Sequence, residues 1–162
     1  SILCIKGDVM DLRTKIDEKY KTAFKSKKTE EINALRLIRS AIKDKDIENR
    51  TIGNNELIND QQIISLLQSL VKQRRDSIDS FKIASRNDLI EKEKKEIEII
   101  NQFLPKQLNE DEIRLIIEKF ISDNKLTSIK EMGKIMGYLK SNHSASINMS
   151  LAGKLTKELL SK

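Results

Sequence analysis

A stripe of basic side chains is the clearest candidate for chemistry in this sequence. Its members lie within about 60° of one another on a helix with 100° per residue: Arg36, Arg39, Lys43 and Arg50. Guanidinium and ammonium groups at this spacing can contact successive phosphates of a nucleic acid. The alternative is a solvated helix face, because the carboxylates of Asp44, Asp46 and Glu48 reduce the positive field.

Further basic residues follow on the next predicted helix: Lys72, Arg75 and Lys82. The nucleic-acid-binding set that we predict is Arg36, Arg39, Lys43, Lys72 and Arg75. Aromatic residues make up only 4% of the chain, and platforms for single-stranded nucleic acid depend on aromatic stacking. We therefore expect recognition of folded RNA through its shape and its phosphates.

Patterns for catalysis and for metal binding are weak. The one histidine, His143, lies in a Ser/Asn-rich loop where little would orient a general base. The chain has no glycine-rich phosphate loop, and a Ser-His-Asp set would have to use His143. The acidic run from Glu91 to Glu98 alternates with lysines, which is typical of a charged helix surface rather than a magnesium site. We predict no catalytic residue, no metal and no cofactor, and hence a binding module or scaffold.

Two opposite charges interrupt the apolar faces of neighbouring predicted helices within Leu66–Gln107. Arg74 falls in the middle of an arc formed by Leu67, Leu70, Val71, Ile78 and Phe81. Glu93 falls inside an arc formed by Leu89, Ile90, Ile97, Ile100 and Leu104. We predict an antiparallel helix pair closed by a structural ion pair between Arg74 and Glu93. In the alternative, both side chains extend from the edge of the interface into water.

The composition predicts an all-α fold. Charged residues make up 35% of the 162 residues, with five glycines, one proline and few aromatics, and no run alternates with period two. The net charge of +6 favours an acidic or polyanionic partner. No stretch is apolar enough to span a membrane, and the single cysteine, Cys4, indicates a reducing compartment. We expect a soluble monomer in the cytoplasm, and an organelle matrix is also compatible.

Helical spacing and capping residues divide the chain into elements. After an extension over residues 1–9, we expect a first helix that starts near Val9 and ends near Lys25, and a second with Thr29 as its N-cap. Asn59 with Gln62 resembles a capping box for the third helix, and a fourth runs from about residue 88 to Leu104. These four helices form the predicted N-terminal domain, 10–104.

The only proline, Pro105, ends the fourth helix because the residue before a proline disfavours helical geometry. We take residues 105–108 as a linker. Beyond it, capping signals at Asn109 and Ser128 and a polar loop over 141–148 separate three short amphipathic helices. The C-terminal domain, 109–162, is therefore predicted to be a three-helix bundle.

Five blocks of this sequence occur in the order seen in YqeY proteins, which the chain resembles from about Met10 to Leu160. The blocks are Leu35–Lys43, Val71–Phe81, Arg86–Leu89, Phe103–Leu108 and Met132–Met136. This family is related to the tail domain of the B subunit of the tRNA-dependent amidotransferase, which makes glutaminyl- or asparaginyl-tRNA with glutamine as nitrogen donor. The resemblance implies a helical N-terminal domain, a three-helix C-terminal domain and a link to tRNA. The glutaminase and kinase-like chemistry of the amidotransferase lies in domains that are absent here.

Two positions depart from the pattern of the family. Related sequences often carry an arginine in the segment before the last helix, where this chain has Ala145–Asn148, and Ser85 replaces a common glycine. If the family contacts RNA through that arginine, this chain lacks the contact.

Three functions follow from these observations. The leading hypothesis is a noncatalytic tRNA-associated accessory protein, with an amidotransferase or an aminoacyl-tRNA synthetase as partner. The second is a protein-interaction module without RNA binding, which the missing arginine and the modest charge favour. The third, direct participation in carbon–nitrogen ligation, is suggested by the family but not by these residues.

Overall fold

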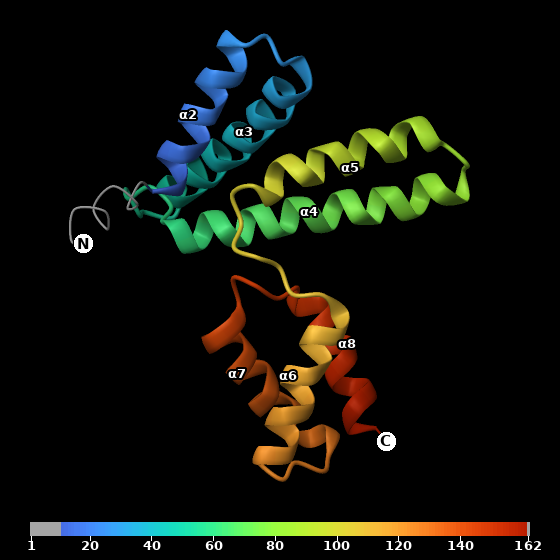
Figure 1. Ribbon diagram of the computed structural model, residues 1–162. Helices are drawn as coiled ribbons and strands as arrows, with labels where there is room; N and C mark the ends of the chain where they lie inside the picture. The colour runs from blue at the N-terminus through green and yellow to red at the C-terminus, as the bar shows by residue number, and fades with distance from the viewer. Residues whose placement is uncertain (1–10, 162) are drawn as a thin grey trace, which may run out of the picture. The chain divides into compact units, whose positions relative to one another are not determined.

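The structure, a computed structural model, describes residues 11–161, and this part of the chain contains seven α-helices, one 3-10 helix and no strand (Figure 1). The predicted all-α fold is confirmed. The chain divides into two compact units, and the division falls between Leu104 and Pro105. The predicted extension 1–9, the proposed start of a helix at Val9 and the interpretation of Cys4 lie outside the described residues.

The first helix pair of unit 1 is α2 (Leu12–Lys25) and α3 (Thr29–Thr51). Asp11 caps α2, because its carboxylate accepts a hydrogen bond from the backbone N–H of Thr14 at 2.8 Å. The prediction of Thr29 as the N-cap of the next helix is wrong by one residue, since Thr29 is already helical and Lys28 takes the cap position without a side-chain bond. Two glutamates in the first turn of α3 favour this start by their interaction with the helix dipole.

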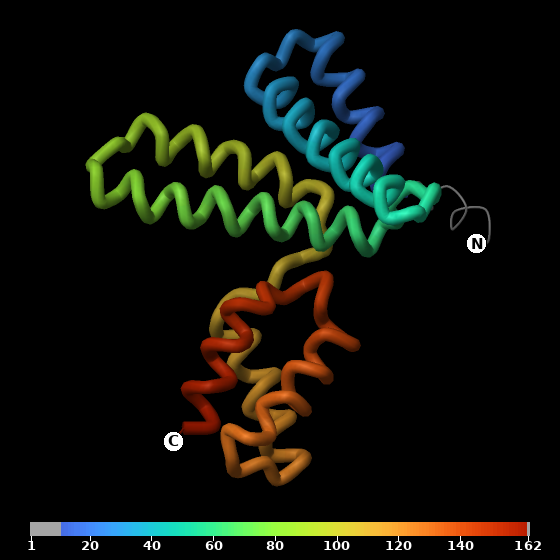
Figure 2. The backbone as a smooth tube through the Cα atoms, turned by 180° about the vertical axis from the view of Figure 1, so that it is seen from behind, coloured from blue at the N-terminus to red at the C-terminus, as the bar shows by residue number. Residues whose placement is uncertain are grey.

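The second helix pair is α4 (Asp60–Ile83) and α5 (Asn87–Asn101), which lie side by side in both views of the backbone (Figures 1 and 2). The predicted capping box of Asn59 and Gln62 is confirmed, with both of its bonds at 2.9 Å. The prediction that the fourth helix continues to Leu104 is wrong by three residues. The backbone N–H groups of residues 102–104 bond to carbonyls three residues earlier, and this tighter turn ends the α-helix.

The core of unit 1 forms where the two helix pairs meet. Its fully buried members include Ile16, Leu35, Ile38, Ile63, Leu67 and Ile100. Leu35 and Ile38 belong to the apolar face predicted for the second helix. The basic stripe of α3 therefore points away from this core, because its residues occupy another side of the same helix.

Unit 2 consists of α6 (Glu110–Asp123), the 3-10 helix η1 (Ile129–Glu131), α7 (Met132–His143) and α8 (Met149–Leu160). Its core contains Ile113, Ile117, Ile135, Leu139, Ile147 and Leu155. The last residues of the predicted linker belong to this unit by their bonds. The Leu108 N–H donates to the Ser146 carbonyl at 2.8 Å, and the side-chain amide of Gln107 donates to the Ala145 carbonyl at 2.8 Å.

A carboxylate on α3 joins three segments of unit 1. Asp46 is 7% exposed and accepts two hydrogen bonds from the Arg13 guanidinium of α2, at 2.9 and 3.0 Å. It also accepts one from the backbone N–H of Ile58, just before α4, at 2.9 Å. Arg13 in turn donates to the Ile58 carbonyl at 3.3 Å. Two parallel bonds from arginine to carboxylate fix orientation as well as distance, so this cluster sets how α2, α3 and the start of α4 meet.

The α4–α5 pair contains the ion pair that the sequence suggested, but with another acid. Arg74 Nε lies 2.8 Å from Glu96 Oε2, and Arg74 also donates to the Leu70 carbonyl at 3.1 Å. The predicted partner Glu93 is thus corrected to Glu96, one turn further along α5. The reason is the hairpin geometry: Arg74 precedes the corner residue Ser85 by eleven positions and Glu96 follows it by eleven.

Glu93 keeps an unfavourable place beside this pair. The pKa of Glu93 is raised above its ordinary value, first because burial disfavours the carboxylate and then because Glu96 repels it. The attraction of Arg74 compensates only in part. The ionised form of Glu93 is therefore less favourable in the folded protein than in the unfolded chain.

Removing either partner of the Arg74–Glu96 pair should destabilise the protein. Both side chains are largely buried, at 12% and 15% exposed, so Arg74→Met or Glu96→Gln should lower the free energy of unfolding by about 3 kcal/mol, because a charge remains without its partner. The double variant should lose much less than the two single losses added together. Urea denaturation of all four proteins measures this coupling.

Glu93→Gln is the matched control for Glu96→Gln. Because its folded-state pKa is raised, the Glu93 carboxylate costs stability at neutral pH, and the amide should stabilise the protein at pH 7. The stabilisation should shrink as the pH falls through the folded-state pKa toward 4.5, the ordinary value. A loss from Glu93→Gln equal to that from Glu96→Gln would contradict the assigned pair.

Asp46→Asn should be the most damaging substitution of a single acidic residue on α3. We expect a loss of about 3 kcal/mol at pH 7, because Arg13 loses its carboxylate partner. The hydrogen bonds from Arg13, with burial opposing them, hold the pKa of Asp46 below its ordinary 3.8. The contribution of the Asp46 carboxylate to stability is complete above pH 3.8 and is lost as the pH falls through the lower folded-state pKa. The difference in free energy of unfolding between the original protein and Asp46→Asn should therefore become smaller over that range.

The exposed neighbour Asp44 supplies the control for Asp46. Asp44→Asn should change stability at pH 7 by no more than about 0.5 kcal/mol, because it removes an exposed carboxylate without a structural partner among the described residues. Urea denaturation of both variants between about pH 7 and pH 3 gives the comparison. Equal losses from the two substitutions would show that Asp46 does not anchor the helices.

Candidate nucleic-acid interface

Three of the predicted binding residues line one groove of about 390 Å³ between α2 and α3. The groove is lined by Arg13, Asp17, Arg36, Arg39, Ser40, Ile42, Lys43 and Asp46. Its four cationic and two anionic side chains leave an excess of positive charge. We call this surface the basic groove. Its charge suits an anion that can reach several cationic groups at once.

Arg39 is held in a fixed place at the groove. Its Nε lies 3.0 Å from Asp17 Oδ1, and its guanidinium carbon lies 4.3 Å from the centre of the Tyr20 ring. The ion pair is close to half exposed on both sides, so it adds little to stability. The effect of the ion pair is to orient the Arg39 guanidinium. The cation–π contact with Tyr20 holds the guanidinium in the same orientation.

Arg36 and Lys43 are the cations of the groove that remain available. Among the described residues, neither forms an ion pair, and both are exposed. They lie two helical turns apart on α3, about 10 Å along its axis, and the hydroxyl-bearing Ser40 lies between them in the sequence. The basic groove thus presents two unpaired cations on either side of a neutral hydrogen-bonding group.

Lys72 and Arg75 do not line the basic groove. Both lie on the exposed part of α4, where Lys72 pairs with Asp76 at 3.3 Å. An exposed pair of this kind contributes less than about 1 kcal/mol and exchanges readily for another partner. The structure therefore gathers Arg36, Arg39 and Lys43 at one groove and leaves the two α4 residues on a separate surface.

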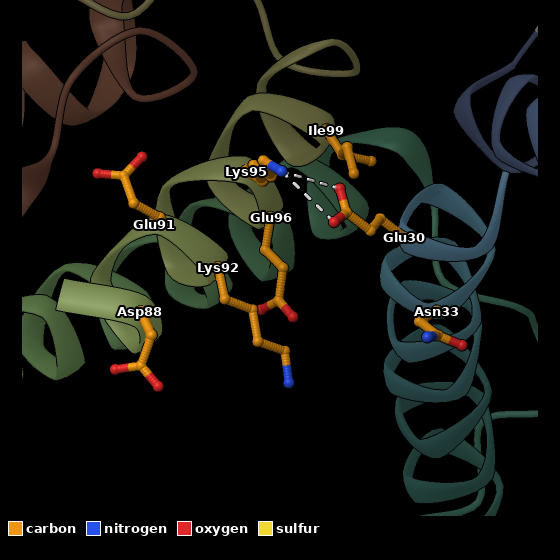
Figure 3. A pocket seen from close by; sticks show the side chains of 8 residues that line it. All are labelled: Glu30, Asn33, Asp88, Glu91, Lys92, Lys95, Glu96 and Ile99. Atoms are coloured by element: carbon orange, nitrogen blue, oxygen red, sulfur yellow. Dashed lines mark hydrogen bonds and ion pairs between the residues drawn. The ribbon is translucent and has the colours of Figure 1, made fainter. Parts of the chain in front are cut away.

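A second groove, between α3 and α5, has the opposite character (Figure 3). About 250 Å³ in volume, it is lined by Glu30, Asn33, Asp88, Glu91, Lys92, Lys95, Glu96 and Ile99. Its four carboxylates outnumber its two lysines, and Lys95 is bound to Glu30 at 3.3 Å across the groove. The other three carboxylates, of Asp88, Glu91 and Glu96, pair with Arg86, Lys94 and Arg74. Their charge is therefore offset locally, and we call this surface the acidic groove after its lining only.

Residues of α2 are the part of the site that sequence reasoning missed. Asp17 and Tyr20 orient Arg39, and Arg13 neutralises Asp46, which the sequence analysis treated only as an acid that weakens the field. The spacing of these residues could have indicated that they act together, because Arg13, Asp17 and Tyr20 share one side of a helix at intervals of four and three residues. It did not reveal which α3 residues they meet.

The segment that lacks the arginine of related sequences has structural roles. Ile147 is 1% exposed in the core of unit 2, and the Asn148 side chain accepts hydrogen bonds from the backbone of Ser150 and Leu151 to cap α8. These two residues therefore contribute to the folding of unit 2.

Two classes of site find no support in the described part of the chain. No cluster of three or more His, Cys, Asp or Glu side chains within it is arranged to hold a metal ion. None of its helices combines the length and apolar content needed to cross a bilayer.

Comparison with known proteins finds fungal relatives. The sequence is 34% identical over 100 residues to Altered inheritance of mitochondria protein 41, mitochondrial, of Candida glabrata, a match that covers 62% of this chain and 47% of that protein. An uncharacterized protein of Schizosaccharomyces pombe is 28% identical over 97 residues, covering 60% of this chain and 75% of that protein. Altered inheritance of mitochondria protein 41, mitochondrial, of Pyrenophora tritici-repentis is 26% identical over 126 residues, a match that covers 74% of this chain and 66% of that protein. The chain spans about half the length of the Candida glabrata relative.

The family is shown by a broader match. The Yqey-like protein profile matches residues 13–160, which includes nearly all of both structural units. The match includes all five of the sequence blocks. The chain therefore belongs to the Yqey-like protein family.

Proposed function

We propose that this protein is a noncatalytic accessory protein that associates with tRNA, and that the basic groove is its main contact. The observation that carries the proposal is the convergence of Arg36, Arg39 and Lys43 on one groove in which Arg36 and Lys43 have no acidic partner among the described residues. The family's resemblance to the amidotransferase tail domain supports tRNA as the nucleic acid. An amidotransferase or an aminoacyl-tRNA synthetase is then the expected protein partner.

The surroundings of Arg39 favour folded RNA over a single strand. Tyr20, which lies beside the groove, has one face covered by the Arg39 guanidinium, and this leaves less of its ring for stacking on a base. The mechanism that remains is contact with phosphates presented by a folded shape. The protein would hold tRNA for a partner enzyme and perform no reaction itself.

The relatives bear on where this would happen. Two of the compared proteins carry mitochondrial in their names, which favours the organelle matrix over the cytoplasm as the proposed location. The tRNA and its enzymes in that compartment would be the partners.

A protein-interaction module remains the second candidate because apolar side chains are exposed. Ile83 is 89% exposed at the α4–α5 corner, and Ile52 and Leu57 are 76% and 54% exposed between α3 and α4. Exposed apolar groups at loops are ordinary when scattered, so they favour this candidate less strongly than the groove favours RNA.

Binding should be tested by fluorescence anisotropy with labelled tRNA, unstructured RNA and duplex DNA over a salt series. We expect tighter binding to tRNA and a log–log salt slope of roughly −4, since each neutralised phosphate contributes about −0.9 for a duplex. Arg36→Ala/Lys43→Ala should reduce the magnitude of the slope by about two.

Lys154→Ala/Lys157→Ala on α8 is the control, because it removes the same charge from exposed sites outside the basic groove. It should change the slope little. Equal effects of the two double variants would show a general attraction to polyanions. Absence of any preference for tRNA would move the assignment to the protein-interaction module.

A further inference from the structure

A groove of unit 1 lies between α3 and α4 and is lined by neutral polar side chains together with the apolar Ile58 and Leu66. Its volume is about 580 Å³. Its amide and hydroxyl side chains are Asn49, Gln61, Gln62, Ser65, Ser69 and Gln73. The two charged residues that line it, Lys45 and Glu48, pair with each other at 3.2 Å. In a chain of which 35% is charged, this groove therefore offers hydrogen bonds with almost no net charge.

Several groups of this neutral groove are available to a ligand, although the Gln62 side chain belongs to the capping box with Asn59 and the Ser69 hydroxyl donates to the Ser65 carbonyl at 3.1 Å. Within the described residues, the side-chain amides of Asn49, Gln61 and Gln73 donate to no protein acceptor. Gln61 and Gln73 are both exposed and are separated by about 18 Å along α4. Each amide can donate and accept hydrogen bonds at once. A ligand that matches them must present repeated groups with the same double capacity.

One basic residue continues the same side of α4 beyond the neutral groove. Lys72 follows Ser65 by seven residues, lies within about 20° of it around the helix and is exposed. Arg75 lies about 160° around the helix from the groove residue Gln73 and therefore faces another side. Lys45 stands on the α3 wall of the groove itself. Cationic groups thus flank neutral hydrogen-bonding groups, which is the order in which phosphates flank sugars along a nucleic-acid backbone.

We infer that the neutral groove reads the ribose 2′-hydroxyl groups of a folded RNA, while Lys72 contacts its phosphates. This inference rests on the proposed binding of RNA and adds to it the means of selecting RNA over DNA. The wide minor groove of an A-form helix displays its 2′-hydroxyls, and a hydroxyl donates and accepts as the groove amides do. It also gives a role to Lys72, a predicted binding residue that lies outside the basic groove.

The test compares three labelled duplexes of one sequence: RNA, the same RNA with 2′-O-methyl groups, and DNA. The methyl ether removes the donor of each ribose hydroxyl. We expect binding to the 2′-O-methyl duplex to be about tenfold weaker than to RNA, the effect of one or two lost hydrogen bonds. The DNA duplex should be weaker by at least as much. This comparison uses the unaltered protein, so folding of a variant does not enter.

A variant locates the effect. Ser65→Ala/Gln73→Ala should bring the ratio of affinities for RNA and 2′-O-methyl RNA close to one and leave the salt slope unchanged, because it removes no charge. The matched pair Ser80→Ala/Gln102→Ala changes the same residue types at exposed positions outside the groove and should keep the ratio.

The outcomes separate this inference from the proposed function. Equal affinity for RNA and 2′-O-methyl RNA, with a normal salt slope, would overturn the inference and leave RNA binding in place. A ratio that persists in Ser65→Ala/Gln73→Ala would overturn the assignment to this groove. No binding to any RNA would overturn both.

Discussion

The arrangement of unit 1 depends on a buried carboxylate. Asp46 holds Arg13 through two hydrogen bonds and the Ile58 backbone through a third, so one side chain connects two helices and the entry to another. A charge that is 7% exposed is tolerated because every strong bond it needs is provided locally. The apolar core alone could slide, since Ile and Leu contacts have little directional preference. The Arg13–Asp46 geometry fixes one orientation, and the basic groove has its walls in that orientation.

The same carboxylate affects the field of the groove. Asp46 lines it, but its charge is offset by Arg13 at hydrogen-bonding distance. Asp17 is likewise offset by Arg39. The residual field then comes from Arg36 and Lys43, which makes the groove positive even though acids are abundant in the surrounding sequence. Fold stability and charge distribution therefore have a common origin in the pairing of α2 with α3.

Local patterns in the sequence predicted most of the fold. Apolar spacing located the helices, and the capping boxes at Asn59 and Asn109 were both confirmed, because each depends on residues three positions apart. Contacts between distant residues were not accessible in this way. Arg13 and Asp46 are 33 positions apart, and many acids on α3 could have served as partner. The prediction of Glu93 as the partner of Arg74 was wrong for a related reason. Both Glu93 and Glu96 lie on the inner side of α5, and the position of the corner at Ser85 decides which of them meets Arg74.

The corner between α4 and α5 contains a serine in a backbone conformation that favours glycine. Ser85 has φ of +55°, in the left-handed region where glycine is favoured. Serine in its place keeps the corner at the expense of backbone strain, which the ion pair of Arg74 with Glu96 helps to offset by closing the hairpin. The register so fixed also decides which α5 residues face α3, and these place Lys95 against Glu30 in the acidic groove. Helix α3 therefore borders a basic, a neutral and an acidic groove. The carboxylates of the acidic groove are offset by cationic partners, whereas Arg36 and Lys43 of the basic groove have no acidic partner among the described residues, so the distribution of charge around α3 follows from the packing of the two hairpins.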